Sequence, residues 1–103
     1  MNVLRRHPLV RFDVRDAINW YEDRQPGLGL EFANDFRAHY HELLHNAELY
    51  AVRFANVRRL NFDRFPYGLF YVIREREIWL LAVLHASRDT ATALAERRRH
   101  FRG

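Results

Sequence analysis

Two histidines and a glutamate stand at the spacing of a zinc motif. His41, Glu42 and His45 form an H-E-x-x-H pattern within a segment of helical periodicity. In zinc proteases such histidines bind the metal from one helical face, and the glutamate acts as general base. Here, however, Leu43 and Leu44 belong to the apolar stripe of the helix, and the chain that follows has strand composition and supplies no third ligand. We therefore interpret the motif as the solvent side of a surface helix, and we expect no metal and no cofactor.

A second pair with chemical potential is Ser87, the only serine, and His85 two residues before it. A nucleophilic serine needs a hydrogen bond to its base. At the end of a strand these side chains are expected to point the same way without a geometry for proton transfer, so a serine hydrolase is not predicted. His85 stays a candidate acid–base group, because an unperturbed imidazole titrates at about pH 6.5. The sequence contains no glycine-rich phosphate loop and no G-x-S-x-G motif.

Arginine dominates the second half of the chain. All 17 lysine-plus-arginine positions are arginine, and the net charge is +4. Residues 1–50 hold six arginines against eight acidic residues, a net charge of −2, whereas residues 51–103 hold eleven against five, a net charge of +6. Arginine-rich codon usage would explain the absence of lysine. The uneven distribution additionally suits a nucleic-acid target or an acidic protein partner.

Length and composition limit the protein class. With 103 residues, 49% of them hydrophobic and 15% aromatic, the chain is expected to form one packed domain over residues 1–103. No apolar run approaches the roughly 20 residues that a membrane span needs, and the start lacks the apolar stretch of a signal peptide. There is no cysteine, so no disulfide framework or thiolate chemistry is available. A cytoplasmic protein is the simplest interpretation.

Hydrophobic periodicity predicts the elements that must position these residues. It indicates an N-terminal edge strand, a helical hairpin whose first helix starts at His7-Pro8 and ends at Gln25-Pro26-Gly27, three further strands and a basic tail. The order predicts an α+β domain with a three-stranded antiparallel sheet. The last two strands are apolar on both faces, so the second face must be covered by another element or left as a binding surface. The expected ranges are 2–6 for the first strand, about 28–45 for the second helix, 57–62, 69–73 and 78–84 for the later strands, and 90–103 for the tail, with a short helix capped near Asp89 or Thr90.

Three segments of the chain carry recognisable motifs: Trp20-Tyr21-Glu22 with Pro26-Gly27-Leu28-Gly29 and Phe32; Val57-Arg58-Arg59-Leu60 with Arg64-Phe65-Pro66-Tyr67 and Phe70-Tyr71; and Ala82-Val83-Leu84-His85 with Arg88-Asp89. Taken in order, they resemble the RelE/ParE superfamily of toxins. The match runs over roughly residues 3–90, and the predicted order of elements agrees with the fold of that superfamily. The resemblance implies a growth-inhibiting toxin of a type II toxin–antitoxin system of the plasmid-stabilisation kind, neutralised by a cognate antitoxin in a hetero-oligomer.

The two branches of this superfamily imply different targets. RelE-like members cut messenger RNA on the ribosome without a metal, and ParE-like members inhibit DNA gyrase. RelE-like nucleases carry an arginine where this chain has Gly68, and a tail acid or tyrosine that falls near Leu94. Because those groups are absent, the comparison favours the ParE-like branch. The endoribonuclease and an inactive member that only binds its antitoxin stay as alternatives.

Five residues are the candidates for target binding, and two of them are also the candidates for catalysis. We expect Arg59, Arg64, His85 and Arg88 to gather on or beside one face. The alternative interpretation is structural: the strand arginines would pair with Asp63, Glu75 or Glu77, His85 would bond a backbone carbonyl, and Arg88 would pair with Asp89. We expect the antitoxin to be an acidic, partly disordered chain that covers the remaining apolar strip. The target-binding candidates are Arg58, Arg59, Arg64, His85 and Arg88; the catalytic candidates are His85 and Arg88.

Overall fold

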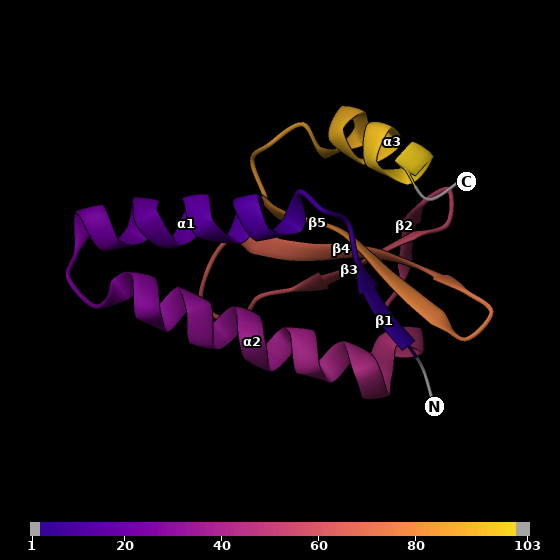
Figure 1. Cartoon of the computed structure of the whole chain (residues 1–103), viewed down its shortest axis with the longest axis horizontal. Helices are drawn as coiled ribbons and strands as arrows, with labels where there is room; N and C mark the ends of the chain where they lie inside the picture. The colour runs from indigo at the N-terminus through magenta and orange to yellow at the C-terminus, as the bar shows by residue number, and fades with distance from the viewer. Residues whose placement is uncertain (1–2, 101–103) are drawn as a thin grey trace.

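The protein is a mixed sheet between a helical hairpin and a C-terminal helix (Figure 1). The computed structural model describes residues 3–100, with the side chain of Phe54 left out. The α+β class and the order of elements are as predicted, and within residues 3–100 no helix is long and apolar enough to span a bilayer. The elements are β1 (Val3–Arg6), α1 (Val10–Arg24), α2 (Leu28–Asn46), the short 3₁₀ helix η1 (Ala47–Leu49), β2 (Val52–Phe54), β3 (Val57–Asn61), β4 (Tyr67–Arg74), β5 (Glu77–His85) and α3 (Thr90–His100).

The sheet has five strands in the order β1-β5-β4-β3-β2. The prediction of a three-stranded antiparallel sheet was therefore incomplete. Strand β2 was missed because three residues are too few to show an alternating pattern, and its register with β3 is irregular. Strand β1 pairs with β5 in parallel, from Val3 beside Glu77 to Arg6 beside Leu80, which makes the sheet mixed. Its predicted first residue, Asn2, lies outside the described residues.

A carboxylate from α1 holds the start of α2. Glu22 accepts hydrogen bonds from the backbone N–H of Gly27, at 3.0 and 3.1 Å, and from that of Gly29, at 3.0 Å. These amides would otherwise lack partners, because the first turn of a helix has free N–H groups. Gly27 has a φ of 91°, and a Cβ on Gly29 would lie 2.8 Å from the carbonyl oxygen of Ile18. The Trp-Tyr-Glu and Pro-Gly-Leu-Gly segments therefore serve one tight helix–helix turn. Helix α1 itself starts at Val10, two residues after the predicted Pro8, which lies in the preceding turn.

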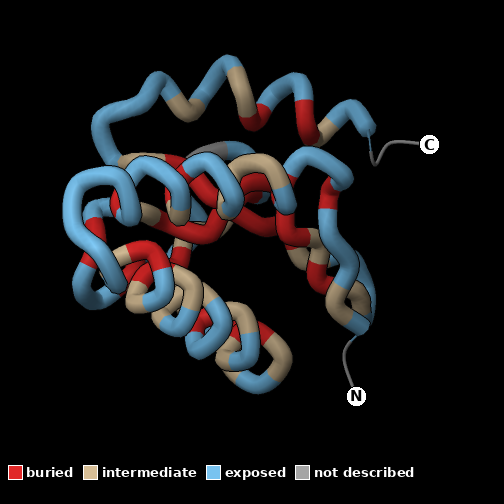
Figure 2. Tube along the Cα trace, turned by 60° about the vertical axis from the view of Figure 1, so that its left-hand side comes forward, coloured by how far each residue is buried: buried red, intermediate tan, exposed pale blue. Residues whose placement is uncertain are grey.

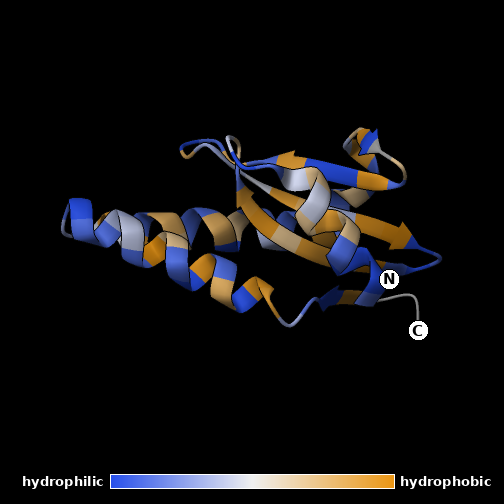
Figure 3. Cartoon of the chain, turned by 90° about the horizontal axis from the view of Figure 1, so that it is seen from above, coloured by the Kyte–Doolittle hydropathy of each residue, from blue (hydrophilic) through white to orange (hydrophobic). Residues whose placement is uncertain are grey.

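Both faces of the central strands are covered. Leu69, Tyr71 and Val83 pack against the hairpin on one face, which we call the hairpin face. Phe70, Leu81 and Leu84 point to the opposite face, the α3 face, where they meet Leu94 and Ala93 of α3. The buried segments accordingly run between the two helical layers in Figure 2, and Figure 3 shows hydrophobic residues along the strands and on the helices that cover them. The expectation that the second face might stay open is corrected, because the predicted tail helix occupies it.

A buried ion pair fastens α3 to the rest of the fold. Arg97 donates to both carboxylate oxygens of Asp13 on α1, at 2.6 and 2.9 Å, and to the carbonyl oxygen of Leu81 at 3.0 Å. Asp13 also accepts from the backbone N–H of Val83 at 3.0 Å. Both side chains are nearly buried, at 7% exposed for Asp13 and 10% for Arg97. The first arginine of the basic tail is therefore structural. Positions 101–103 of the predicted tail lie outside the described residues.

Candidate functional site

A hollow of about 340 Å³ lies between α1 and the end of β5. His85 and Arg88 both line it, because β5 ends at His85 and the next turn carries Arg88 back toward α1. These are the two predicted site residues that the structure brings into one hollow, which we call the α1 pocket. Its lining residues are Asp13, Asp16, Ala17, Trp20, Tyr21, Tyr67, Val83, Leu84, His85 and Arg88.

The His85 ring is held by the turn that follows it. Its Nδ1 accepts a hydrogen bond from the backbone N–H of Ser87 at 2.9 Å and lies 2.8 Å from the Ser87 hydroxyl. The expectation that Ser87 and His85 would lack a proton-transfer geometry was wrong. The strand ends at His85, so the chain turns and returns the serine to the ring. The expected bond from His85 to a backbone carbonyl is replaced by this contact with Ser87.

This contact decides the tautomer of His85. An amide N–H can only donate, so Nδ1 must be unprotonated, and the single proton of the neutral ring is on Nε2. A neutral His85 can therefore donate through Nε2 but cannot accept a proton there while the Ser87 contact is intact. The hydroxyl of Ser87 must also donate to Nδ1 in this tautomer. The pair has the distance of a hydrolase dyad and lies at an exposed turn.

The α1 pocket combines aromatic surface with charges of both signs. Trp20 is 49% exposed there, and Arg24 lies over its ring with the guanidinium carbon 3.4 Å from the centroid. Tyr67 packs edge-on against His85, with ring centroids 5.2 Å apart, and burial raises the pKa of its hydroxyl. Asp16 adds an exposed carboxylate beside Arg88, whereas the carboxylate of Asp13 is already paired with Arg97. Such a surface repels a phosphate more than a basic cleft would, and it suits a protein partner.

Arg59 belongs to a different surface. It lies in β3 and points to the α3 face, with its guanidinium 5.0 Å from the Phe70 ring centre and its Nε donating to the side chain of Asn61. A Cβ on Gly68 would lie 2.7 Å from the Arg59 Nε, so the arginine side chain passes directly over that glycine. Burial, and then the positive charge of Arg53, lower the pKa of Arg59. A hollow of about 350 Å³, which we call the α3 pocket, is lined by Arg53, Val57, Arg59, Asn61, Phe70, Thr90 and Leu94.

The other two predicted arginines make local structural contacts. Arg58 points to the hairpin face and donates to the carbonyl oxygens of Glu48, at 3.1 Å, and Tyr50, at 2.8 Å. Arg64 forms a 2.6 Å ion pair with Glu31 of α2, not with the acidic residues expected from the sequence.

The expected single arginine–histidine face is therefore divided. Arg59 is on the α3 face, whereas His85 and Arg88 line the α1 pocket on the hairpin side. The division follows from the alternation of β3 and from the side on which β5 ends. Asp89, expected beside Arg88, instead lies 3.4 Å from the Thr92 hydroxyl at the start of α3.

Sequence reasoning missed some lining residues and placed the H-E-x-x-H motif correctly. His41 and His45 are exposed on α2, with ring centroids 5.2 Å apart, as the solvent-side interpretation predicted. Arg53 was missed because it lies on β2, for which no periodic signal exists. Asp13 was missed because its partners are more than 65 residues away along the chain.

Comparisons with known proteins agree with this architecture. Residues 4–90 match the family model described as "ParE toxin of type II toxin-antitoxin system, parDE". Among solved structures, a chain of the chromosomal ParDE toxin–antitoxin system from P. aeruginosa is similar, with a TM-score of 0.74 and 21% sequence identity. The similarity covers 84% of this chain and 98% of that one. No curated protein sequence matches this chain.

Proposed function

Because this chain belongs to the ParE toxin family of type II toxin–antitoxin systems, we propose that it arrests growth by binding DNA gyrase and does not act as a nuclease. Membership of this family implies that a cognate antitoxin is the partner of the toxin. The choice of gyrase over ribosome-bound message rests on one observation: the candidate catalytic residues are divided between two surfaces of the protein. Cleavage through a ribose 2′-OH needs a base, a cation near the phosphate and an acid for the leaving oxygen in one place. Here Arg59 and His85 lie on opposite sides of the sheet.

The remaining pair, His85 and Arg88, lacks a base. The Ser87 N–H holds the proton of neutral His85 on Nε2, so the ring cannot take a proton from a 2′-OH at that atom. Leu94, near the position of the tail acid in RelE-like nucleases, is buried against the sheet. These contacts support an inhibitor that works by binding.

The α1 pocket is the surface that we assign to the target. Exposed tryptophan and arginine are the residue types that carry most of the binding energy in protein interfaces. Trp20, its stacked neighbour Arg24 and Arg88 provide this combination beside a concave wall. Arg88 does not form the expected ion pair with Asp89, whose carboxylate lies 3.4 Å from the Thr92 hydroxyl.

In the alternative function, a ribosome-dependent endoribonuclease, the α3 pocket would bind the RNA. The guanidinium of Arg59 crosses Gly68, where RelE-like nucleases carry an arginine, so a cation is supplied from the neighbouring strand. Arg53 adds a second positive charge there. This surface would bind a phosphate backbone. It lacks a residue that could serve as the acid or base among its described lining residues.

One set of variants separates the candidate functions. Purified toxin is assayed for inhibition of gyrase supercoiling and for cleavage of ribosome-bound messenger RNA. We expect gyrase inhibition that falls at least tenfold in Trp20→Ala and Arg88→Ala, with Arg59→Ala as the matched control that leaves it unchanged. Message cleavage abolished by Arg59→Ala would replace the gyrase proposal with the nuclease. If the parent protein neither inhibits gyrase nor cleaves message, the remaining candidate is an inactive family member that only binds its antitoxin.

The antitoxin is proposed to be acidic. The second half of the toxin carries a net charge of +6 from eleven arginines against five acidic residues, and charge complementarity speeds association. Because α3 already covers the sheet, the apolar strip expected for the antitoxin must lie elsewhere than on the α3 face. Co-expression with the neighbouring gene product, at low and high salt, tests the pairing. A toxin that stays a stable monomer in both conditions would contradict it.

A further inference from the structure

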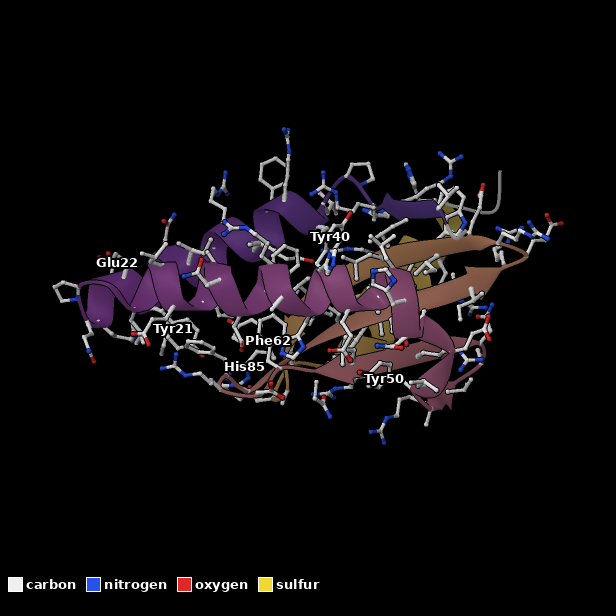
Figure 4. The ribbon with its side chains drawn as sticks, turned by 90° about the horizontal axis from the view of Figure 1, so that it is seen from below. Tyr21, Glu22, Tyr40, Tyr50, Phe62 and His85 are labelled. Atoms are coloured by element: carbon white, nitrogen blue, oxygen red, sulfur yellow. The ribbon has the colours of Figure 1, made fainter. Side chains whose placement is uncertain are left out.

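We propose that Asp35, His39 and Asp63 bind a divalent transition-metal ion of the zinc type. Asp35 and His39 lie on α2, and Asp63 lies in the loop between β3 and β4. One ligand atom from each residue falls within 4.8 Å of the others. The site is beside Phe62, whose ring is 5.4 Å from that of His39 and which Figure 4 shows next to α2. The three ligands are distinct from the two histidines of the H-E-x-x-H motif, His41 and His45, which face solvent on the same helix.

Unpaired buried atoms point to a ligand at this place. His39 is 7% exposed at its side chain, yet neither ring nitrogen has a hydrogen-bond partner among the described residues. The same holds for Oδ2 of Asp35, one helical turn earlier. Buried polar atoms in folded proteins are nearly always paired. A metal ion bound to Nε2 of His39 and to the Asp35 carboxylate would satisfy two of these groups, and Nδ1 of His39 would remain for a second contact.

The distances between the ligand atoms are close to those of a metal site. Nε2 of His39 lies 3.4 Å from Oδ1 of Asp35 and 3.7 Å from Oδ2 of Asp63. Ligand atoms about 2.0–2.2 Å from a tetrahedral zinc ion lie roughly 3.3–3.6 Å apart. An imidazolium could donate through Nε2 to only one of these carboxylates, and neither contact has hydrogen-bond geometry. A metal between the three atoms would engage both carboxylates at once.

The opposite nitrogen of His39 also has a suitable neighbour. Oε1 of Glu42 lies 3.9 Å from Nδ1. A histidine that ligates through one nitrogen commonly donates the other N–H to a carboxylate, which orients the ring. A small rotation of the half-buried Glu42 would make that bond. Three residues on one helical face would then serve as ligand, ligand and orienting group.

The donor set and the exposure indicate the kind of ion. One imidazole and two carboxylates favour zinc, cobalt or nickel over magnesium and calcium, which take oxygen ligands alone. Asp63 is 82% exposed, and together with His39 it lines a hollow of about 330 Å³, so an ion can enter from solvent and water can complete its coordination. A bound ion would tie α2 to the β3–β4 loop.

Zinc titration of the full-length, tag-free chain tests the site. We expect one equivalent of Zn²⁺ by calorimetry, a rise in the thermal midpoint on zinc addition, and visible absorption bands when Co²⁺ is used instead. Asp63→Asn should weaken zinc binding at least tenfold without disturbing the fold, because the side chain is exposed. His39→Gln should abolish binding.

The exposed pair His41 and His45 provides the matched control. These side chains are one helical turn apart and could themselves bind zinc. The double variant His41→Gln/His45→Gln should keep the stoichiometric equivalent and the cobalt bands. Absence of zinc binding in the parent chain, zinc binding in Asp63→Asn that equals the parent, or loss of binding in the double variant would each overturn the proposal.

Discussion

The Asp13–Arg97 pair should dominate the stability of the α3 layer. In Asp13→Ala the Arg97 guanidinium loses a bidentate partner at 2.6 and 2.9 Å and keeps only the Leu81 carbonyl, while the Val83 N–H loses its acceptor. Removing one partner of a buried ion pair costs about 3–5 kcal/mol. Release of α3 would limit this loss, because Arg97 could then reach water at the expense of exposing Leu94, which costs about 2–3 kcal/mol.

We therefore expect Asp13→Ala to lower the free energy of unfolding by about 3 kcal/mol, which corresponds to a fall in the thermal midpoint of roughly 12–24 °C. Denaturant titration measures the first quantity and calorimetry the second. Amide hydrogen exchange should show lost protection in α3 before the rest of the domain. The double variant Asp13→Ala/Arg97→Met should lose less than the sum of the single variants, since it leaves no buried charge unpaired.

Asp16→Ala is the matched control for this prediction. Asp16 is three residues further along α1 and pairs with Arg15 at 3.0 Å, but the two side chains are 69% and 59% exposed. Its loss should cost less than about 0.5 kcal/mol. An effect of Asp13→Ala as small as that of Asp16→Ala, or strict additivity in the double variant, would refute the reasoning about the buried pair.

Three further outcomes are expected. Glu22→Ala should cost about 1–2 kcal/mol in denaturant titration, because the amides of Gly27 and Gly29 lose their acceptor; unchanged stability would show that water replaces the carboxylate. Tyr71→Phe should cost about 1–2 kcal/mol through loss of the 2.6 Å bond to the Ala47 carbonyl. Burial raises the pKa of Tyr71 to about 12, so its contribution to the free energy of unfolding is complete below pH 10 and is lost as pH rises toward 12. Between pH 10 and 12 the stability of Tyr71→Phe should therefore fall less steeply than that of the parent, and equal slopes would show that Tyr71 is not the source of the alkaline loss. Burial, and then the charge of His100, lower the pKa of His7, so the unfolded chain binds the proton first and stability should fall as pH drops below about 6.5; His7→Gln should reduce that acid slope in a stability–pH series, and an unaltered slope would exclude His7 as its source.

Local signals in the sequence were enough for the helices, the long strands and the family. The stripe of α2 needed only spacing at three and four residues, and the Pro-Gly segment after α1 marked the turn. Strands β4 and β5 were visible because they are apolar runs rich in β-branched and aromatic residues and bounded by charged residues, a pattern typical of strands that are buried on both faces. The same observation left two alternatives for the second face, a covering element or a binding surface, and the structure shows that the tail helix α3 covers it.

The site depended on contacts that no local pattern encodes. The parallel pairing of Val3 with Glu77 and the bond between Asp13 and Arg97 join residues more than 70 positions apart. An arginine side chain is long enough to reach several acceptors, so its identity alone does not select its partner.

The sequence by itself therefore determined an α+β toxin fold and a basic second half. Only the tertiary structure decided that Arg97 is buried, that Arg59 and His85 lie on opposite sides of the sheet, and that Asp63 comes beside His39. The physical reason is that periodicity reports which face of an element is buried, whereas the partner of a polar side chain is set by how distant elements pack together.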